Sequence, residues 1–389
     1  MTAFSPDAAK AFAGHTDFRV AAAERFAVAA MPTTDAEIWR YSRIDKFELD
    51  RYQPAAATTS VEAGSAAQYV STEPTSAPEL FSGETPDVFA ELNRAFMTPV
   101  VVSVPRGATV EQPILITHTI SGDGIAVFPR LVIDAGENSE ISVVERFVAA
   151  DGAEADGALV VPILQVQAGQ AARVKYLAIN EAGDATWQLG NQQAVGKRDS
   201  TTMLATVTLG GDYVRSSTNA RLTGQGAFTR QVALYFAGGD QMHDFRTTQD
   251  HDAPNTNSDL LFKGAVQDDS SSVYTGLIKI REHAGGTTAY QTNRNLTLSD
   301  GAWAESVPNL DIRTNDVKCS HASTVGPIDE DQRYYLESRG VRPEVAERLV
   351  VLGFFDEVIE QLPAGRLTDD LRSRVAAKLD VGARKEVSV

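Results

Sequence analysis

The chain contains little cysteine and relatively little positive charge, and each shortage excludes a class of protein. The single cysteine, Cys319, cannot form an intrachain disulfide, so the sequence lacks the disulfide framework of a small secreted domain. The 35 Lys and Arg residues are outnumbered by 52 Asp and Glu residues, which gives a formal net charge of −17. Nucleic acids and anionic membrane surfaces bind clustered basic residues, so we expect neither of them as a partner.

Several functional segments are also missing from the sequence. No stretch approaches the roughly 20 apolar residues that span a bilayer, and residues 1–20 do not resemble a signal peptide. We therefore expect a protein of the reducing cytoplasm. The chain has no P-loop, no GxGxxG before a helix and no GxSxG, so the sequence predicts no nucleotide site and no serine hydrolase site.

Proline is absent between Pro162 and Pro254, as a long series of paired strands requires. From about Thr98 apolar residues alternate with polar ones, for example at Met203, Ala205 and Val207, and glycine-containing turns separate the alternating stretches. A sandwich, a barrel or a solenoid would fit this pattern. We favour a parallel β-helix over residues 98–327, because a sandwich of this length would exceed usual domain sizes and no repeat motif indicates a propeller.

Helical patterns flank this β-rich core. Residues 1 to about 50 are Ala-rich with apolar residues at helical spacing, and 53–80 is a Thr-, Ser- and Pro-rich segment that we expect to be a flexible connection or a loosely packed surface excursion. Together they form a predicted N-terminal helical region, 1–97. After the core, Asp329, Pro343 and Thr368 each mark the start of a helix in a predicted C-terminal helical domain, 328–389.

The motif KCSHASTVG, residues 318–326, carries the first candidate site. On a strand, Cys319 and His321 point to the same face, and thiolate and imidazole are suitable ligands for iron, zinc or copper(I). Two ligands do not complete a tetrahedral site, so a metal would take its other ligands from elsewhere, including a second chain. A nucleophile–base pair would need hydrogen-bonding reach, which this spacing does not provide unaided. The plain alternative is a buried cysteine beside a surface histidine.

The other histidines give weaker signals. Asp250, His251 and Asp252 could contact a cation, but consecutive strand residues do not converge, so we favour a loop at a solenoid corner. Four histidines stand alone and are interpreted as surface or hydrogen-bonded residues: His15, His118, His243 and His283.

Three longer segments carry a resemblance to a known family. They are SDLLFKGAVQDDSSSVYTGLIKI (258–280), AYQTNRNLTLS (289–299) and DVKCSHASTVGPIDEDQRYYLESRGV (316–341), and EIWRYS (37–42) adds weaker support. The sequence resembles the SufB/SufD family of iron–sulfur cluster assembly proteins, and the KCSHxxTVG form is closer to its SufD branch. Ala322 departs from the pattern, since glycine is common there.

The resemblance implies a right-handed parallel β-helix between helical domains, in a non-enzymatic scaffold that pairs with SufB and binds the ATPase SufC through its C-terminal helices. It implies that a nascent cluster forms near the SufB–SufD interface, with His321 contributing and Cys319 a weaker candidate. Any iron–sulfur cluster or iron at that interface would be transient, and no cofactor is expected to stay bound to the chain alone. The sequence leaves open whether the isolated chain forms a homodimer.

The C-terminal helices are more apolar than one short helix pair needs. We expect part of this surface to contact the ATPase, and an internal helical core explains the pattern equally well. The residues concerned are Leu349, Leu352, Phe354 and Phe355.

Two other functions remain open at this point. A β-helix enzyme acting on polysaccharides would place carboxylates and basic residues along a cleft. A purely structural β-helix subunit would use its ends for docking and would have no chemistry at His321.

Overall fold

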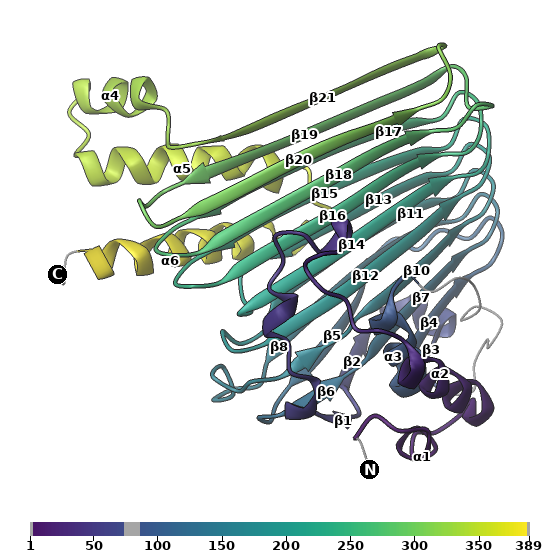
Figure 1. Cartoon of the computed structure of the whole chain (residues 1–389). Coiled ribbons are helices and arrows are strands. Elements are labelled where there is room, and N and C mark those ends of the chain that lie inside the picture. The colour runs from purple at the N-terminus through teal and green to yellow at the C-terminus, as the bar shows by residue number, and fades with distance from the viewer. Residues whose placement is uncertain (1–2, 74–85, 387–389) are drawn as a thin grey trace.

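The computed structural model describes residues 3–73 and 86–386 and is mainly β, with helices at both ends. The core is a parallel β-solenoid of about eight turns, or rungs, each formed by one strand from each of two sheets. The predicted fold class is therefore confirmed. Figure 1 shows the rungs stacked from the purple N-terminal end to the green C-terminal end.

The strands divide between two sheets. The first sheet contains β3 (Val70–Ser71), β4 (Thr98–Val104), β7 (Pro129–Ala135), β10 (Ile163–Ala168), β12 (Trp187–Gly196), β14 (Tyr213–Leu222), β16 (Met242–His251), β18 (Ser271–Ile280) and β20 (Trp303–Ile312), with β1 (Gln53–Ala55), β6 (Ile125–Val127) and β9 (Leu159–Val160) beside them. The second contains β2 (Thr58–Glu62), β5 (Ile114–Ile120), β8 (Glu140–Ala149), β11 (Arg173–Glu181), β13 (Thr201–Thr208), β15 (Phe228–Ala237), β17 (Asn257–Val266), β19 (Thr287–Thr297) and β21 (Val317–Gly326).

The alternation in the sequence places every second side chain inside the solenoid. In the early rungs the inward residues are aliphatic, such as Val102, Ile133 and Val166, and they form one continuous core. Successive rungs lie 26 to 33 residues apart, as when Asn191 pairs with Ser217 or Arg130 with Ile163. This variable spacing explains why the sequence shows no clean repeat.

The corners between strands need backbone conformations that most residues avoid. Four Asn or Asp residues adopt a positive φ there, namely Asn138, Asp199, Asn255 and Asp268. The recurring Ala-Gly pairs also occupy equivalent places, because Ala168 pairs with Ala135. A Cβ on the following Gly169 would lie 2.7 Å from the Ala135 carbonyl oxygen, so glycine is required for the rungs to stack at this corner.

The N-terminal region covers the outer face of the first sheet. Its helices are α1 (Pro6–Ala9), α2 (Thr16–Val28) and α3 (Val88–Phe96), and its 3-10 turns are η1 (Glu37–Trp39), η2 (Ile44–Lys46), η3 (Leu49–Arg51) and η4 (Gly64–Tyr69). Trp39 and Phe89 pack with Trp187 and Tyr213 of the sheet. The helical pattern expected up to about residue 50 holds only to Val28, and the segment 37–51 forms short 3-10 turns instead, because it is held by contacts to the sheet.

For residues 53–73 the structure overturns the flexible connection, one of the two expected alternatives. β2 pairs antiparallel with β5, and β3 pairs antiparallel with β4, so the segment is a partly exposed part of the sheets. Alternating Thr, Ser and Val side chains suit such an edge strand, despite the small-residue composition of the segment. Positions 74–80 of the predicted flexible segment lie outside the described residues.

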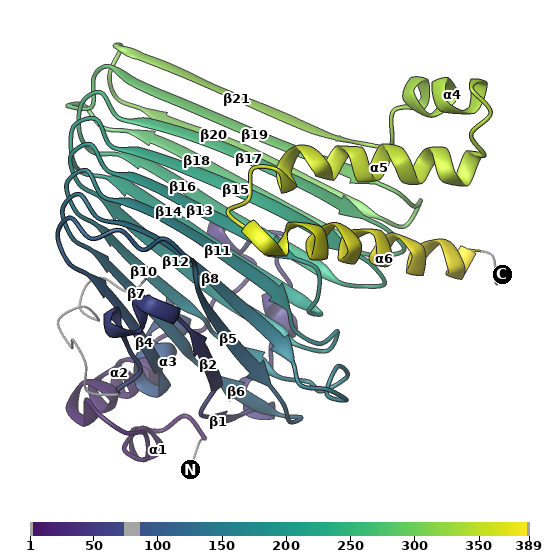
Figure 2. The same cartoon turned by 180° about the vertical axis from the view of Figure 1, so that it is seen from behind.

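The C-terminal helices are α4 (Glu330–Ser338), α5 (Pro343–Ile359) and α6 (Thr368–Glu386), with the turn η6 (Gly365–Leu367) before α6. Figure 2 shows α5 and α6 along the outer face of the second sheet, whereas α4 packs on α5 beyond the ends of the strands. Phe355 is fully buried and stacks near Phe236, with 5.7 Å between the ring centroids. Over the described ranges, no helix is long and apolar enough to cross a membrane.

Candidate functional site

The last rung of the solenoid is uncovered. Strand β20 pairs only with β18, and β21 only with β19, so each leaves one row of backbone groups unpaired by any described strand. The inward side chains of this rung include Leu310, Ile312 and Val325, which are 42, 39 and 42% exposed. The opposite end differs, because β2 and β3 cover the first strands. The open end, formed by β20 and β21, is visible in Figure 1.

Cys319 and His321 lie on the inner face of this open end. Their register partners on β19 are Ala289 and Gln291, whose side chains are buried inside the solenoid. His321 continues the same row one rung further, where no described strand covers it, and its side chain is exposed. The imidazole makes no hydrogen bond or ion pair within residues 3–73 and 86–386. Both of its nitrogens are therefore available to a group brought from outside the chain.

Cys319 has a different environment from His321. Its side chain is partly buried and packs beside the cluster of Ile278, Ile280 and Ala289. Burial raises the pKa of the Cys319 thiol, which disfavours the thiolate that binds metals. The described residues contain no group of three or more His, Cys, Asp or Glu side chains able to hold a metal ion. A metal at His321 would thus need ligands from a facing chain.

A polar layer lies beneath His321, and the sequence did not predict it. Buried Gln291 approaches the Tyr274 hydroxyl, which also lies 3.0 Å from Thr247 Oγ1. In the same row of β19, Asn293 Nδ2 donates to the Tyr235 hydroxyl at 2.9 Å. Most inward side chains of the early rungs are aliphatic, apart from a chain around His118 and Glu145, whereas the rungs next to the open end are amide- and hydroxyl-rich. Alternation identifies the inward positions, but Gln and Asn look like surface residues in a sequence.

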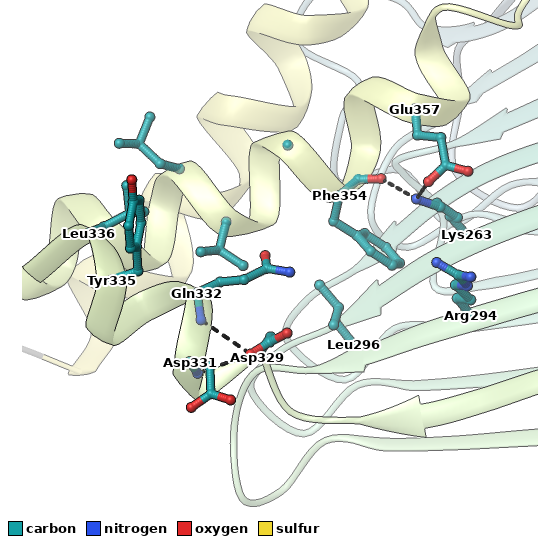
Figure 3. Close-up of a pocket in the computed structure, with 13 residues that line it drawn as sticks. Lys263, Arg294, Leu296, Asp329, Asp331, Gln332, Tyr335, Leu336, Phe354 and Glu357 are labelled. Atoms are coloured by element: carbon teal, nitrogen blue, oxygen red, sulfur yellow. Dashed lines mark hydrogen bonds and ion pairs between the residues drawn. The ribbon is translucent and has the colours of Figure 1, made fainter.

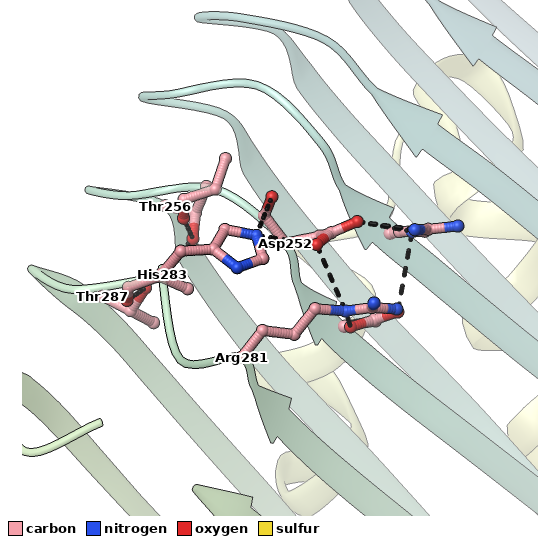
Figure 4. Close-up of polar contacts among 9 residues, drawn as sticks. Asp252, Thr256, Arg281, His283 and Thr287 are labelled. Atoms are coloured by element: carbon pink, nitrogen blue, oxygen red, sulfur yellow. Dashed lines mark hydrogen bonds and ion pairs between the residues drawn. The ribbon is translucent and has the colours of Figure 1, made fainter. Parts of the chain in front are cut away.

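The Asp250-His251-Asp252 motif does not form one site. His251 points inward between Thr256 Oγ1 and Ser258 Oγ, each 2.8 Å away, and its burial lowers its pKa to about 4. Asp250 and Asp252 instead form an ion-pair ladder with arginines of the two neighbouring rungs, and Figure 4 shows Arg281 beside Asp252. Arg281 donates to Asp250 at 2.8 and 3.0 Å. These carboxylates are neutralised by arginine, which leaves them poorly suited to a cation.

Asp252 extends this ladder on both sides. It accepts from Arg221 at 2.6 Å, and its Oδ1 lies 2.9 Å from His283 Nε2. The predicted hydrogen-bonded role of His283 is thereby confirmed, and the ladder ties neighbouring rungs together.

His118 is buried in a hydrogen-bonded chain. Its ring nitrogens lie 2.8 Å from Thr59 Oγ1 and 2.9 Å from Glu145 Oε1, and the Tyr176 hydroxyl donates to the other Glu145 oxygen at 2.5 Å. His243 is also fully buried, and this burial lowers its pKa to about 3. These two histidines are interior residues.

A groove of about 800 Å³ separates α4, α5 and the outer face of β17 and β19 (Figure 3). Buried Lys263 forms its inner end and donates to the Phe354 carbonyl at 2.8 Å and to Glu357 at 2.5 Å. Leu349, 46% exposed, and Tyr335, 57% exposed, line its open part.

The four residues of α5 that were predicted to contact a partner thus differ in how exposed their side chains are. Leu349 is exposed, and Leu352 and Phe354 are partly buried. Phe355 is fully buried and belongs to the internal core, so its side chain offers no exposed surface for the predicted partner contact. At Phe355 the internal-core alternative holds.

Comparisons with known proteins show which family the chain resembles. Residues 118–354 match the family model described as "SUF system FeS cluster assembly, SufBD core domain". The chain is 34% identical, over 89% of its length and 88% of the relative, to an iron–sulfur cluster assembly SufBD family protein of Mycobacterium tuberculosis. It is 29% identical to the iron–sulfur cluster assembly protein SufD of Escherichia coli, covering 77% of this chain and 71% of that protein. The chain is also 30% identical to the iron–sulfur cluster assembly protein SufD of Bacillus subtilis, and the match covers 71% of this chain and 63% of that protein.

Proposed function

The chain belongs to the SufBD family of iron–sulfur cluster assembly proteins, and from this premise we propose that it is a SufD-type scaffold subunit of a cytoplasmic assembly complex. In this role it is not an enzyme. It binds a SufB-like subunit at the open end of its solenoid and a SufC-like ATPase at its C-terminal helices. The cluster is cargo that forms transiently between the subunits.

The observation that carries the proposal is the position of His321. It is an exposed imidazole on the inner face of an uncovered rung, beside two strand edges that remain free to pair. A strand-bearing partner that docks on these edges would bury His321 together with its own side chains. His321 then supplies one nitrogen ligand or proton acceptor, and the partner supplies the other ligands.

Cys319 has a supporting role in this proposal. Its packing against Ile278 and Ile280 and its raised thiol pKa favour a small apolar residue that fixes β21. His321 is therefore the residue of the motif that acts on the cluster.

The C-terminal groove supports the second contact. Leu349 and Tyr335 expose apolar surface beside the Lys263–Glu357 ion pair, which is the mixture of apolar and polar groups found in protein interfaces. The chain has no nucleotide motif of its own, so ATP hydrolysis would come from the separate ATPase.

The test is to coexpress the chain with the SufB-like and SufC-like subunits of its source organism and to purify the complex without oxygen. We expect the His321→Ala complex to form with normal subunit ratios but to contain at least fivefold less iron and acid-labile sulfide. Ser323→Ala is the matched control, because Ser323 lies two residues further along the same exposed inner face.

An unchanged cluster content in the His321→Ala complex would leave the purely structural subunit as the better description. Failure of the wild-type chain to assemble with either subunit would overturn the scaffold function itself.

A further inference from the structure

A short N-terminal strap crosses the outer face of the first sheet close to the open end. The strap is defined here as residues 37–44, and Figure 1 shows this purple segment lying over the strands. Arginines of the sheet hold its backbone: Arg215 donates to the Ile38 carbonyl at 2.5 Å, and Arg246 donates to the Arg40 carbonyl at 2.6 Å. The Arg215 guanidinium also lies 3.8 Å from the centroid of the Trp39 ring. These contacts fix the strap before Tyr41, and after it Arg43 donates to Asp212 at 2.9 Å.

Tyr41 has an unfavourable backbone conformation and an exposed ring. Its φ is 65°, in the left-handed region that aromatic residues rarely adopt, and its side chain is 46% exposed. Such conformations persist where surrounding contacts enforce them, and they concentrate at functional sites. The backbone bends here so that the ring reaches Trp303, with 6.1 Å between the ring centroids.

Trp303 is the last member of an outward-facing row on the first sheet. The row follows the strand register through Trp187, Tyr213, Met242, Ser271 and Trp303. The first three of these side chains are buried beneath the N-terminal region. Trp303 is 42% exposed because it lies on the edge strand β20, where the next position of the row belongs to no described strand.

We propose that Tyr41 and Trp303 form an aromatic clamp that receives an apolar side chain from a second β-solenoid subunit whose edge strand pairs with β20. Two observations favour this occupant: the free edge of β20 and the outward-facing row that ends at Trp303. A strand added to β20 places one outward side chain directly next to Trp303, about 4.8 Å further along the stack. Exposed Trp and Tyr at the centre of such a contact are typical hot-spot residues. This inference rests on the proposed function, because the partner is the SufB-like subunit that would cover His321.

The clamp implies a function for the N-terminal segment that its packing alone does not require. The inner face of the open end would contribute His321 to the cluster, while the outer face would contribute affinity. These two contributions are separable by mutation.

The experiment uses the full chain labelled with 5-fluorotryptophan and the purified SufB-like subunit as the probe. The chain has three tryptophans, of which Trp39 and Trp187 are 3 and 8% exposed, so Trp303 alone should report on the edge. A Trp303→Phe variant assigns its fluorine resonance. We expect this resonance to shift when the partner is added, while the resonances of Trp39 and Trp187 stay in place.

Binding is measured in parallel by titration calorimetry. We expect Trp303→Thr and Tyr41→Asn each to raise the Kd at least tenfold. Thr keeps strand propensity, and Asn tolerates the positive φ, so both variants should fold, which thermal unfolding verifies. Val28→Thr is the control, because Val28 is an exposed apolar residue, 86% accessible, at the end of α2.

Other results overturn the clamp in distinguishable ways. If the partner binds all variants equally and the Trp303 resonance stays in place, the clamp is wrong while the proposed function stands. If wild-type chain does not bind the partner, the proposed function fails and the clamp fails with it. If the resonance shifts with chain concentration alone, the occupant is a second copy of this chain, which also contradicts the proposal.

Discussion

At the scale of single residues, Gly264 explains how a long aromatic side chain fits between two rungs. The Tyr235 ring lies over Gly264 on the next rung, and its hydroxyl donates to Asn295 Oδ1, two rungs away, at 2.6 Å. A Cβ at position 264 would lie 1.9 Å from Tyr235 Cε2. The absence of a side chain at 264 therefore makes the hydrogen bond possible.

We predict that Gly264→Ala destabilises the chain by about 2 kcal/mol, because the Tyr235 ring must move in a packed interior and lose its bond to Asn295. Urea unfolding followed by circular dichroism measures the change. Gly353→Ala is the matched control, since a Cβ there meets nothing within 4 Å on the surface of α5. Equal stability of the two variants would show that the ring relaxes freely.

The sequence predicted some of these residue-level features and missed others. The spacing of Cys319 and His321 was enough to place them on one face of a strand, as the structure confirms. The contrast between them was not predictable, because it depends on Ile278 and Ile280, which lie on β18. The amide layer around Gln291 was also missed, since burial of a polar side chain is set by its rung and not by its neighbours in sequence.

At the scale of elements, α6 is fastened to the solenoid by a lysine that has no carboxylate within hydrogen-bonding distance among the described residues. Lys378 Nζ donates to the Leu209 carbonyl and to Gln241 Oε1, which lies 2.7 Å away. Gln267 Nε2 donates back to the Lys378 carbonyl at 3.1 Å. Desolvation lowers the pKa of Lys378 to about 8, against smaller opposing effects of Asp184 and Asp268.

We predict that Lys378 makes α6 docking more favourable as pH rises. Below about pH 8 the amine is protonated in both the folded and the unfolded chain. Folding then bears the full cost of removing the charged amine from water. Between about pH 8 and the ordinary lysine pKa of 10.5 the folded chain binds fewer protons than the unfolded chain, so stability rises with pH. The part of this rise that comes from Lys378 should be absent in Lys378→Met.

The measurement is hydrogen exchange of the α6 amides at several pH values, corrected for intrinsic rates, in wild type and Lys378→Met. Subtracting the two profiles removes other groups that titrate in this range. An identical pH dependence in both proteins would contradict the assignment of the effect to Lys378.

Elements defined by local patterns were predicted well, and those defined by distant contacts were not. The strands between Thr98 and Gly326 follow from alternation and from the absence of proline over much of that range. The segment after Asp35 has a helix-like composition, yet it forms short turns because Arg215 and Arg246, far away in the sequence, bind its carbonyls. No local pattern records such contacts.

At the scale of the whole molecule, the two proposed partner surfaces lie on different elements. The open end presents the edges of β20 and β21, whereas the groove is formed by α4, α5 and the outer face of β17 and β19. Strand β21 leads directly into α4, so the site of His321 and the groove are connected through a few residues around Asp329, the N-cap of α4. A partner bound at one surface thus adjoins the element that carries the other.

This arrangement predicts that the ATPase contact can be lost without loss of the SufB-like contact. Leu349→Asp puts a charge into the apolar part of the groove, and because Leu349 is 46% exposed the fold should persist. We expect the SufC-like ATPase to bind at least tenfold more weakly, as for a hot-spot residue, while the SufB-like subunit copurifies unchanged.

Val28→Asp, at the other end of the molecule, is the control for an added surface charge. Calorimetry with each purified partner makes the comparison. Undiminished ATPase binding would move that interface away from the groove, and loss of both partners together would mean that the open end and the helices act as one surface.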